Sequence, residues 1–258
     1  MCGTCGCGHT LLKPPQRKGV EGAVQYRSTT QTETRRVRVE RDLLAENDTL
    51  AAQNRAFFAA RNILALNLVS SPGSGKTTLL VQTIIALNGK KALAVIEGDQ
   101  QTDHDAARIR ATGVQAIQIN TGKGCHLDGG MVGHALEQLA LPENSLLFIE
   151  NVGNLVCPAA FDLGEAHKVL LLSVTEGEDK PLKYPTIFNS ADLAVITKMD
   201  LAEVVEFSSS AARANIQAVR PGMRVLELST KSGGGMQDYF DFLLTSLSQI
   251  RAQLSQTV

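Results

Sequence analysis

A glycine-rich stretch ending in lysine and threonine is the first feature of this sequence that could do chemistry. It reads Ser70-Ser71-Pro72-Gly73-Ser74-Gly75-Lys76-Thr77 and lies between an apolar run at 63–69 and a helical pattern at 76–87. The amides of such a loop bind phosphate oxygens, its lysine reaches the terminal phosphates, and its hydroxyl reaches Mg²⁺. The pattern predicts a phosphate-binding loop, although Ser70 stands where the usual motif begins with glycine. We expect nucleotide contacts from Gly73, Ser74, Gly75, Lys76, Thr77 and Thr78.

Acidic residues follow two later apolar runs. Asp99 and Asp105 come after the run at 92–97, and Glu150 ends the run at 145–150. Either aspartate could hold Mg²⁺ or order an attacking water, and either could instead cap a helix. Glu150 could hold a metal-bound water while the Gly153 amide contacts the γ-phosphate. We therefore expect Lys76, Asp99 and Glu150 to be catalytic, with Thr77 and Asp99 as Mg²⁺ ligands.

The apolar run at 193–197 ends in Thr197-Lys198-Met199-Asp200. An aspartate here can accept hydrogen bonds from guanine N1 and the exocyclic amine, which adenine does not offer. Ser229-Thr230-Lys231, after the run at 225–229, could contact the guanine carbonyl. Because a site built for such hydrogen bonds rejects a base that lacks them, these residues predict guanine specificity.

Three of the five cysteines, Cys2, Cys5 and Cys7, lie at the very start of the chain. Thiolates with amine or amide nitrogen suit square-planar Ni²⁺ or Cu²⁺, whereas three thiolates with an outside ligand suit Zn²⁺. The alternative is an exposed cysteine-rich tail without a ligand. We expect a metal motif at 1–9, followed by a flexible linker at 10–35.

The remaining cysteines suggest a second metal site. Cys125 is followed by His126, and Cys157 lies seven residues after Glu150. An adjacent Cys-His pair does not easily complete a tetrahedral site, so we expect Cys157 as a third ligand, with His134 as a further candidate. The alternative for Cys157 is a small buried apolar residue.

Alternating strand and helix patterns must position these groups. Strands are expected at 63–69, 92–97, 114–119, 145–150, 168–174, 193–197 and 225–229. Helices are expected at 36–61, 76–87, 101–111, 128–140, 203–219 and 235–253. This alternation predicts an α/β fold with a mostly parallel sheet and helices on both faces, and ligands at the carboxyl ends of the strands. The first helix should pack on the sheet edge through a stripe of Val39, Leu43, Leu50 and Phe57, with Leu44, Ala51 and Phe58 beside it.

Composition excludes some classes of function. The chain has 258 residues and a net charge of −1, which argues against electrostatically driven nucleic-acid binding. No apolar run approaches the length of a membrane span, and the N-terminus lacks the pattern of a signal peptide, so we expect a cytoplasmic protein without membrane partners.

Taken together, the motifs resemble those of the HypB family, the nickel-incorporation GTPases of [NiFe]-hydrogenase maturation. The resemblance rests on Cys2-x-x-Cys5-Gly6-Cys7, Leu44-Ala45-Glu46-Asn47, Ser70–Thr78, Glu97-Gly98-Asp99, Gly124-Cys125-His126-Leu127-Asp128, Glu150–Pro158, Thr175–Pro185 and Thr197-Lys198-Met199-Asp200. It implies a P-loop NTPase of the SIMIBI class of G domains, spanning 36–258, that forms a homodimer on binding GTP. It also implies a tight nickel site at Cys2, Cys5 and Cys7, and a Ni²⁺ or Zn²⁺ site at Cys125, His126 and Cys157 near the dimer interface. The implied partners are a HypA-type nickel/zinc accessory protein and the hydrogenase large-subunit precursor.

The expected function is a slow GTPase, with GTP/GDP, Mg²⁺, Ni²⁺ and Zn²⁺ as ligands, that inserts Ni²⁺ into the hydrogenase precursor. Nucleotide state would alter the second metal site through the loop from Glu150 to Cys157. Two alternatives stay open: an ATP-dependent P-loop enzyme with a structural zinc site, and a non-enzymatic metal buffer. Lys180 is a candidate for contact with a neighbouring subunit's nucleotide.

Overall fold

The computed structural model describes residues 30–100 and 104–255. The chain divides into two compact units, residues 1–39 and residues 40–258. Of the first unit, residues 30–39 are described, and they begin helix α1 (Thr30–Ala60). Among the described helices, none combines the length and apolar character needed to cross a bilayer.

Seven parallel strands form one sheet in the order β3-β2-β4-β1-β5-β6-β7. They are β1 (Leu64–Ser70), β2 (Leu93–Asp99), β3 (Gln115–Asn120), β4 (Leu146–Glu150), β5 (His167–Ser173), β6 (Leu193–Thr197) and β7 (Arg224–Glu227). In the central register, Leu68 lies between Glu150 of β4 and Val169 of β5. Parallel pairing brings all seven carboxyl ends to one edge, where ligands bind in such sheets. The predicted parallel sheet is confirmed.

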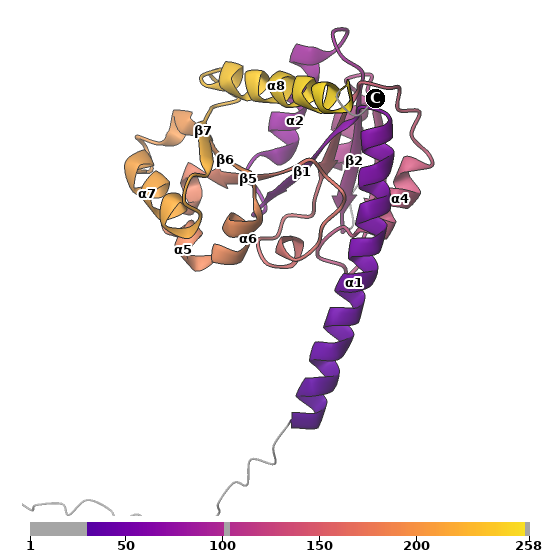
Figure 1. Ribbon diagram of the computed structural model, residues 1–258. Coiled ribbons are helices and arrows are strands. Elements are labelled where there is room, and N and C mark those ends of the chain that lie inside the picture. The colour runs from indigo at the N-terminus through magenta and orange to yellow at the C-terminus, as the bar shows by residue number, and fades with distance from the viewer. Residues whose placement is uncertain (1–29, 101–103, 256–258) are drawn as a thin grey trace, which may run out of the picture. The chain divides into compact units, whose positions relative to one another are not determined.

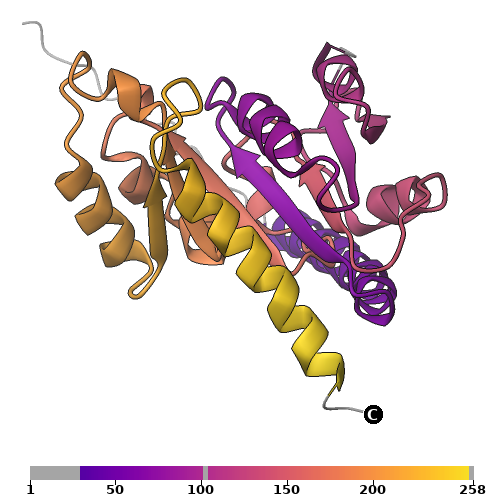
Figure 2. The same cartoon turned by 90° about the horizontal axis from the view of Figure 1, so that it is seen from above.

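Helices cover both faces of this sheet (Figure 1). They are α2 (Lys76–Leu87), α3 (His104–Arg110), α4 (Gly129–Leu136), α5 (Lys180–Lys183), α6 (Pro185–Ser190), α7 (Ser209–Val219) and α8 (Met236–Ser255). Residues of α2, α3 and α8 share one core, and α8 lies across the sheet beside β1 (Figure 2). On the other face, α4 and the end of α1 form one core, and α6 and α7 form another.

Strand β1 shows why the central strands read as continuous apolar runs. Leu64, Leu66 and Leu68 belong to the core under α2 and α8, whereas Ala65 and Val69 belong to the cores on the opposite face. Side chains alternate between faces along a strand, and both faces are covered here. Every residue of β1 is therefore buried.

Helix α1 differs from its prediction in two ways. It begins at Thr30, so residues 30–35 of the expected linker are helical. Its buried residues are Asn47, Ala51, Asn54 and Phe58, whereas Val39 and Leu43 are 50% and 56% exposed. The prediction is wrong for Val39 and Leu43, whereas Phe57 packs against the core and the neighbouring Ala51 and Phe58 are buried. Two buried asparagines with hydrogen-bond partners, Asn47 and Asn54, complete the packing face.

Two short helices, α5 and α6, were not expected. Each has proline within its first two positions, Pro181 and Pro185, where the missing N–H is tolerated. Helix α7 begins at Ser209, six residues later than predicted, because the Ser208 side chain caps it by accepting from the Ala211 amide. Helix α4 ends at Leu136, before the predicted residue 140.

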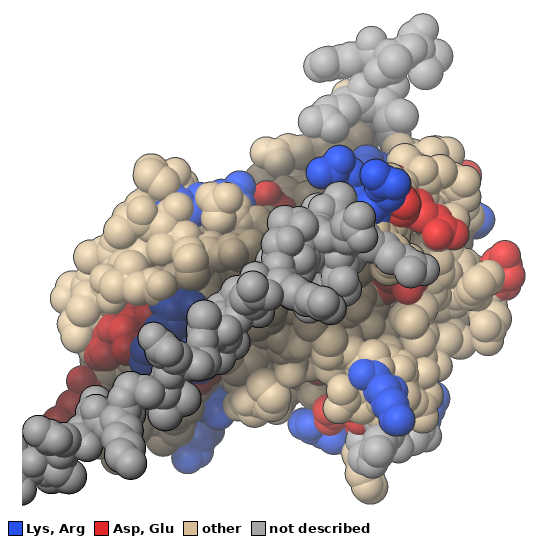
Figure 3. All heavy atoms as spheres, turned by 90° about the horizontal axis from the view of Figure 1, so that it is seen from below, with Lys and Arg blue, Asp and Glu red and all other residues tan. Residues whose placement is uncertain are grey.

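Charged side chains are dispersed on the face viewed in Figure 3. Where the grey residues leave the surface visible, Lys and Arg lie in small groups among Asp, Glu and uncharged residues. This distribution agrees with the net charge of −1 and offers no broad basic surface on that visible part for a polyanion.

Candidate nucleotide pocket and metal cluster

The predicted phosphate loop connects β1 to α2. Gly73 and Gly75 have φ values of 76° and 95°, in the left-handed region that favours glycine. Gly75 directly precedes the first residue of α2, Lys76, whose Nζ donates to Ser70 Oγ at 2.8 Å. The serine that departs from the usual motif thus holds the lysine. Burial lowers the pKa of Lys76, while the carboxyl of Glu150 acts in the opposite direction.

A cavity of about 570 Å³ opens at the carboxyl edge beside this loop. It brings together the predicted residues of three strand ends with the loop, and we call it the nucleotide pocket. Its lining includes Gly73, Gly75, Lys76, Thr77, Thr78, Asp99, Asp105, Glu150, Gly153 and Lys198. Gly153 packs closely against the phosphate loop, since a Cβ on it would lie 3.0 Å from Pro72 Cα.

Glu150 lies at the floor of the nucleotide pocket. Thr77 Oγ1 donates to Glu150 Oε1 at 2.7 Å, while Oε2 is buried and has no hydrogen-bond partner among the described residues. Burial raises the pKa of Glu150 to about 7, and the charge of Lys76 partly offsets the rise. An unpaired buried carboxylate oxygen beside a threonine hydroxyl suits a hard divalent cation such as Mg²⁺. Asp99 lines the same pocket.

The predicted base-recognition residues divide into two roles. Thr197 Oγ1 donates to Ser74 O at 2.7 Å, and Lys198 Nζ donates to Gly73 O at 2.7 Å, so both support the phosphate loop. Asp200 and Ser229 line a separate pocket of about 350 Å³, where Ser229 Oγ donates to Asp200 Oδ1 at 2.6 Å. The pocket is also lined by Met199, Glu227, Leu228, Ser232 and Gly234.

Thr230 and Lys231 follow Ser229 in the loop after β7. The Lys231 amide donates to Ser229 Oγ at 3.2 Å, so this residue helps to orient the serine. Thr230 is half-buried. Their predicted contact with a guanine carbonyl stays a prediction.

Two further residues belong to the nucleotide pocket or its loop although the sequence did not single them out. Arg108 of α3 lines the pocket, pairs with Asp105 at 3.1 Å and approaches Thr78 Oγ1 at 3.4 Å. Glu176 Oε1 accepts from Ser74 Oγ at 2.7 Å. The i, i+3 spacing of Asp105 and Arg108 on a predicted helix was the available signal for the arginine.

The structure brings together the three residues predicted for the second metal site. One donor atom from each of Cys125, His126 and Cys157 lies within 4.8 Å of the others, and we call these residues the metal cluster. The two Sγ atoms are 2.7 Å apart, and Cys125 Sγ is 3.7 Å from His126 Nδ1. Both cysteines are free and half-buried. Two thiols and an imidazole form a donor set that suits Zn²⁺ or Ni²⁺.

The surroundings tune the metal cluster. A hydrogen bond with Cys157 raises the pKa of Cys125, and burial also raises it. Burial lowers the pKa of His126, which favours the neutral imidazole that can bind a metal. The His126 ring lies 3.8 Å from the ring of Phe161, at an interplanar angle of 31°.

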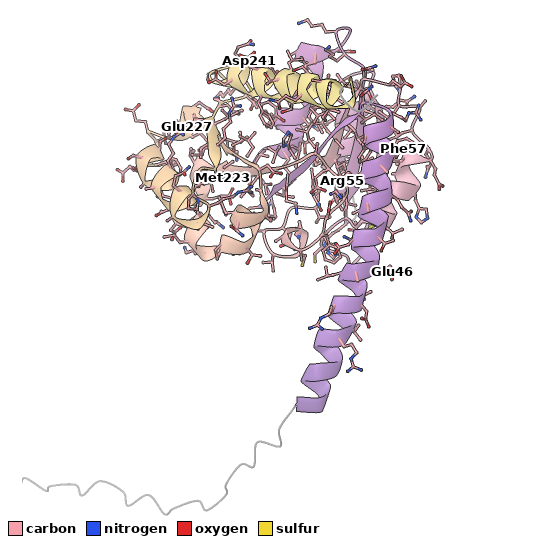
Figure 4. All side chains as sticks on the ribbon, in the orientation of Figure 1. Glu46, Arg55, Phe57, Met223, Glu227 and Asp241 are labelled. Atoms are coloured by element: carbon pink, nitrogen blue, oxygen red, sulfur yellow. The ribbon has the colours of Figure 1, made fainter. Side chains whose placement is uncertain are left out.

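His134 lies outside this cluster of mutually close donor atoms. With His126, Asp128, Met131 and Phe161 it lines an adjacent groove of about 540 Å³, which Glu46 of α1 also lines. Figure 4 labels Glu46 on this helix. Cys2, Cys5 and Cys7 lie outside the described residues, so the N-terminal nickel site stays a prediction.

One short loop reaches both sites. It runs from Glu150 in the nucleotide pocket to Cys157 in the metal cluster, and we call it the 150–157 loop. Within it, Asn154 Nδ2 donates to Cys125 O at 3.3 Å. The loop therefore carries the ligand Cys157 and contacts the segment that carries Cys125 and His126.

Residues 64–227 match the family model described as "CobW/HypB/UreG, nucleotide-binding domain". The hydrogenase maturation factor HypB of Azotobacter vinelandii is 58% identical over 223 residues, covering 86% of this chain and 74% of that protein. HypB of Escherichia coli K12 is 56% identical over 286 residues, covering 95% and 99%.

Solved HypB structures give the same result. The Helicobacter pylori protein in complex with nickel has a TM-score of 0.75 and 42% identity, over 79% of this chain and 96% of that chain. The Archaeoglobus fulgidus protein has a TM-score of 0.74 and 40% identity, over 79% and 99%. The predicted α/β fold with a P-loop is confirmed, and the chain belongs to the HypB family of hydrogenase maturation factors.

Proposed function

We propose that this protein is a GTP-hydrolysing nickel metallochaperone that inserts Ni²⁺ into the [NiFe]-hydrogenase large-subunit precursor. The observation that carries the proposal is the 150–157 loop, which begins at Glu150 in the nucleotide pocket and ends at Cys157 in the metal cluster. The maturation-factor names of the relatives and the nickel complex of the Helicobacter pylori protein support it.

In this proposal the phosphate loop amides and Lys76 hold the triphosphate, and Asp200 selects guanine. Asp99 and Glu150 orient the water that attacks the γ-phosphorus, so that the bond to the β-phosphate oxygen breaks and GDP and phosphate leave. Thr77, Asp99 and Glu150 would hold Mg²⁺, which neutralises charge on the β- and γ-phosphates. Turnover is slow in this proposal.

Nickel is the cargo of the metal cluster. Cys125 and Cys157 supply thiolates and His126 supplies a neutral imidazole, a set that also accepts Zn²⁺. GTP-dependent homodimerisation would control release, with a HypA-type accessory protein and the hydrogenase precursor as partners in the cytoplasm. A nucleotide-driven movement of the 150–157 loop would change the ligand geometry.

Nickel titration in two nucleotide states tests the proposal. A triple variant, Cys2→Ser with Cys5→Ser and Cys7→Ser, removes the predicted N-terminal nickel site and leaves the metal cluster. This variant is titrated with Ni²⁺ in the presence of saturating GDP or of a saturating non-hydrolysable GTP analogue. We expect the two affinities to differ at least fivefold, a coupling typical of allosteric proteins. Lys76→Ala should abolish the difference at saturating nucleotide, because the charge that contacts the terminal phosphates is lost and the two nucleotides no longer act differently. Equal affinities in both states would remove the switch.

A further inference from the structure

Four polar side chains lie inside the protein between the sheet and the segments that carry the metal ligands. Asn67 is fully buried, Asn151 is 1% exposed, and Lys168 is 7% exposed. The side chain of Glu165 is 6% exposed. Buried polar groups destabilise a fold unless they are paired, so their partners show what they hold in place. We call Lys168, Glu165, Asn67 and Asn151 the buried polar network.

The network is continuous from one residue to the next. Lys168 Nζ lies 3.8 Å from Glu165 Oε1, and Asn67 Nδ2 donates to the same oxygen at 3.0 Å. Asn151 Nδ2 donates to Asn67 Oδ1 at 3.2 Å. Asn67 lies on β1, in the middle of the sheet, and Asn151 directly follows the last residue of β4, Glu150.

The two ends of the network hold the metal-ligand segments. At one end, Asn151 Oδ1 accepts from the Leu127 amide at 3.0 Å, one residue after His126. At the other end, Lys168 Nζ donates to Pro158 O at 3.1 Å, one residue after Cys157.

The same lysine also fixes the residue that packs on the histidine ligand. Lys168 Nζ donates to Phe161 O at 3.2 Å, and the Phe161 ring lies against His126. The buried polar network therefore holds both segments that carry metal ligands. It binds Leu127 and Pro158, each one residue after a ligand, and Phe161, whose ring contacts the ligand His126.

We propose that Asn151 is a positioning residue for the metal cluster. We also propose that the buried polar network carries nucleotide state from Asn151, next to Glu150, through Asn67 to Lys168, which holds the Pro158 carbonyl beside Cys157. The nucleotide and metal assignments rest on the proposed function. Asn151 connects the nucleotide pocket to the metal cluster, because its backbone directly follows Glu150 and its side chain accepts from the Leu127 amide, next to His126. Outer-shell hydrogen bonds of this kind orient metal ligands and tune affinity.

Two substitutions at Asn151 separate its two roles. In Asn151→Asp, a carboxylate oxygen still accepts from the Leu127 and Val152 amides, but the donor to Asn67 Oδ1 is lost. We expect nickel affinity with GDP to stay within about twofold of the parent, and the GTP-analogue effect to shrink at least fivefold. In Asn151→Ala the acceptor is lost as well, so nickel affinity should fall roughly tenfold in both states.

The measurement is a Ni²⁺ titration at saturating nucleotide, in full-length variants carrying Cys2→Ser, Cys5→Ser and Cys7→Ser. The thiolate-to-nickel charge-transfer absorption is recorded in each state, because it reports ligand geometry and a purely structural role would not move it. Asn88→Asp is the matched control: Asn88 is exposed, its side chain donates to Thr112 O, and neither residue lines the nucleotide pocket or belongs to the metal cluster. If Asn151→Asp does not fold, Asn67→Ser breaks the same link and replaces it.

The outcomes distinguish this inference from the proposed function. Parental affinity and a parental nucleotide effect in both Asn151 variants would overturn the positioning role. A parent protein with equal affinities in both states would overturn the proposed switch. In that case the positioning role is decided by Asn151→Ala alone, which supports it if nickel affinity falls tenfold and overturns it if affinity is unchanged.

Discussion

At the scale of single residues, the carboxyl of Glu150 has an environment that suits coordination of a cation. One oxygen accepts from Thr77, and the other is buried without a hydrogen-bond partner among the described residues. Burial raises its pKa to about 7 from 4.5. The folded apo protein therefore binds more protons than the unfolded chain between these values, and this group's contribution to stability falls as pH rises through that window.

The same shift predicts pH-dependent nucleotide binding. If Glu150 holds Mg²⁺–GTP as proposed, binding needs the ionised carboxylate, so affinity should fall roughly thirtyfold from pH 8 to pH 5.5 through Glu150 alone. Calorimetric titration of the parent and of Glu150→Gln measures this. The variant retains the titration of GTP itself, so the difference between the two curves belongs to Glu150. Parallel curves would contradict the prediction.

Arg108 offers a positive charge to the nucleotide pocket from within the chain. We expect Arg108→Ala to weaken binding of a GTP analogue about fivefold to tenfold, since a charged hydrogen bond contributes about 1.5–3 kcal/mol and this side chain is half exposed. GDP affinity should change less. Arg110→Ala, on the same helix but outside the pocket lining, is the control. Equal losses for the two nucleotides would exclude a contact specific to the γ-phosphate.

Asp200 tests the identity of the base. Its carboxylate lies in the pocket with Ser229, at the position expected to accept from guanine. Asp200→Asn should lower GTP affinity by at least roughly a hundredfold and create binding of xanthosine triphosphate, because the amide now matches the xanthine edge. Competition binding with both nucleotides measures the change, and a variant that still prefers guanine would assign base recognition elsewhere.

At the scale of elements, α1 is held against the metal-site segments by backbone proximity and buried amides. Asn47 Oδ1 accepts from the Gly129 amide at 2.8 Å, and Asn54 Nδ2 donates to Gly129 O at 2.8 Å. Gly164 packs so closely that a Cβ on it would lie 2.6 Å from Ala51 O. Helix α1 is thereby tied to the first residue of α4, three residues after His126.

This close packing predicts a stability effect at Gly164. Its φ is +87°, so Gly164→Ala adds backbone strain of about 1–2 kcal/mol and overpacking of about 1–3 kcal/mol. Gly222 has φ +80°, and a Cβ added to it would meet nothing within 4 Å, so Gly222→Ala is the matched control for strain alone. Urea denaturation should show the larger loss at Gly164, and equal losses would mean that α1 does not pack tightly there.

At the scale of the whole molecule, metal and nucleotide binding must be reciprocal. If a GTP analogue changes nickel affinity at the metal cluster by some factor, nickel must change the analogue's affinity by the same factor. Nucleotide titrations with and without saturating Ni²⁺ measure this. In Cys125→Ser with Cys157→Ser, nickel should no longer alter nucleotide affinity. A nickel effect that persists in that variant would place the coupling at another site.

Local patterns in the sequence were sufficient for much of this protein. The phosphate loop is contiguous, so residues 70–78 already specify its turn and the start of α2 at Lys76. The apolar runs located all seven strands to within about two residues. For the five inner strands the reason is burial on both faces, whereas the edge strands β3 and β7 are half-buried or exposed over most of their length. The Cys125-His126 pair was also recognisable from the sequence, because its two donor residues are neighbours in the chain.

Tertiary structure decided what the distant residues do. Glu176 reaches Ser74 across 102 positions, and Asn151 reaches Asn67 across 84, and neither pair was expected from the sequence. These contacts depend on the strand order β3-β2-β4-β1-β5-β6-β7, which places β4 between β2 and β1. Strands that are apolar on both faces look alike in sequence, so their order, and every side chain that meets across it, is determined only when the chain packs.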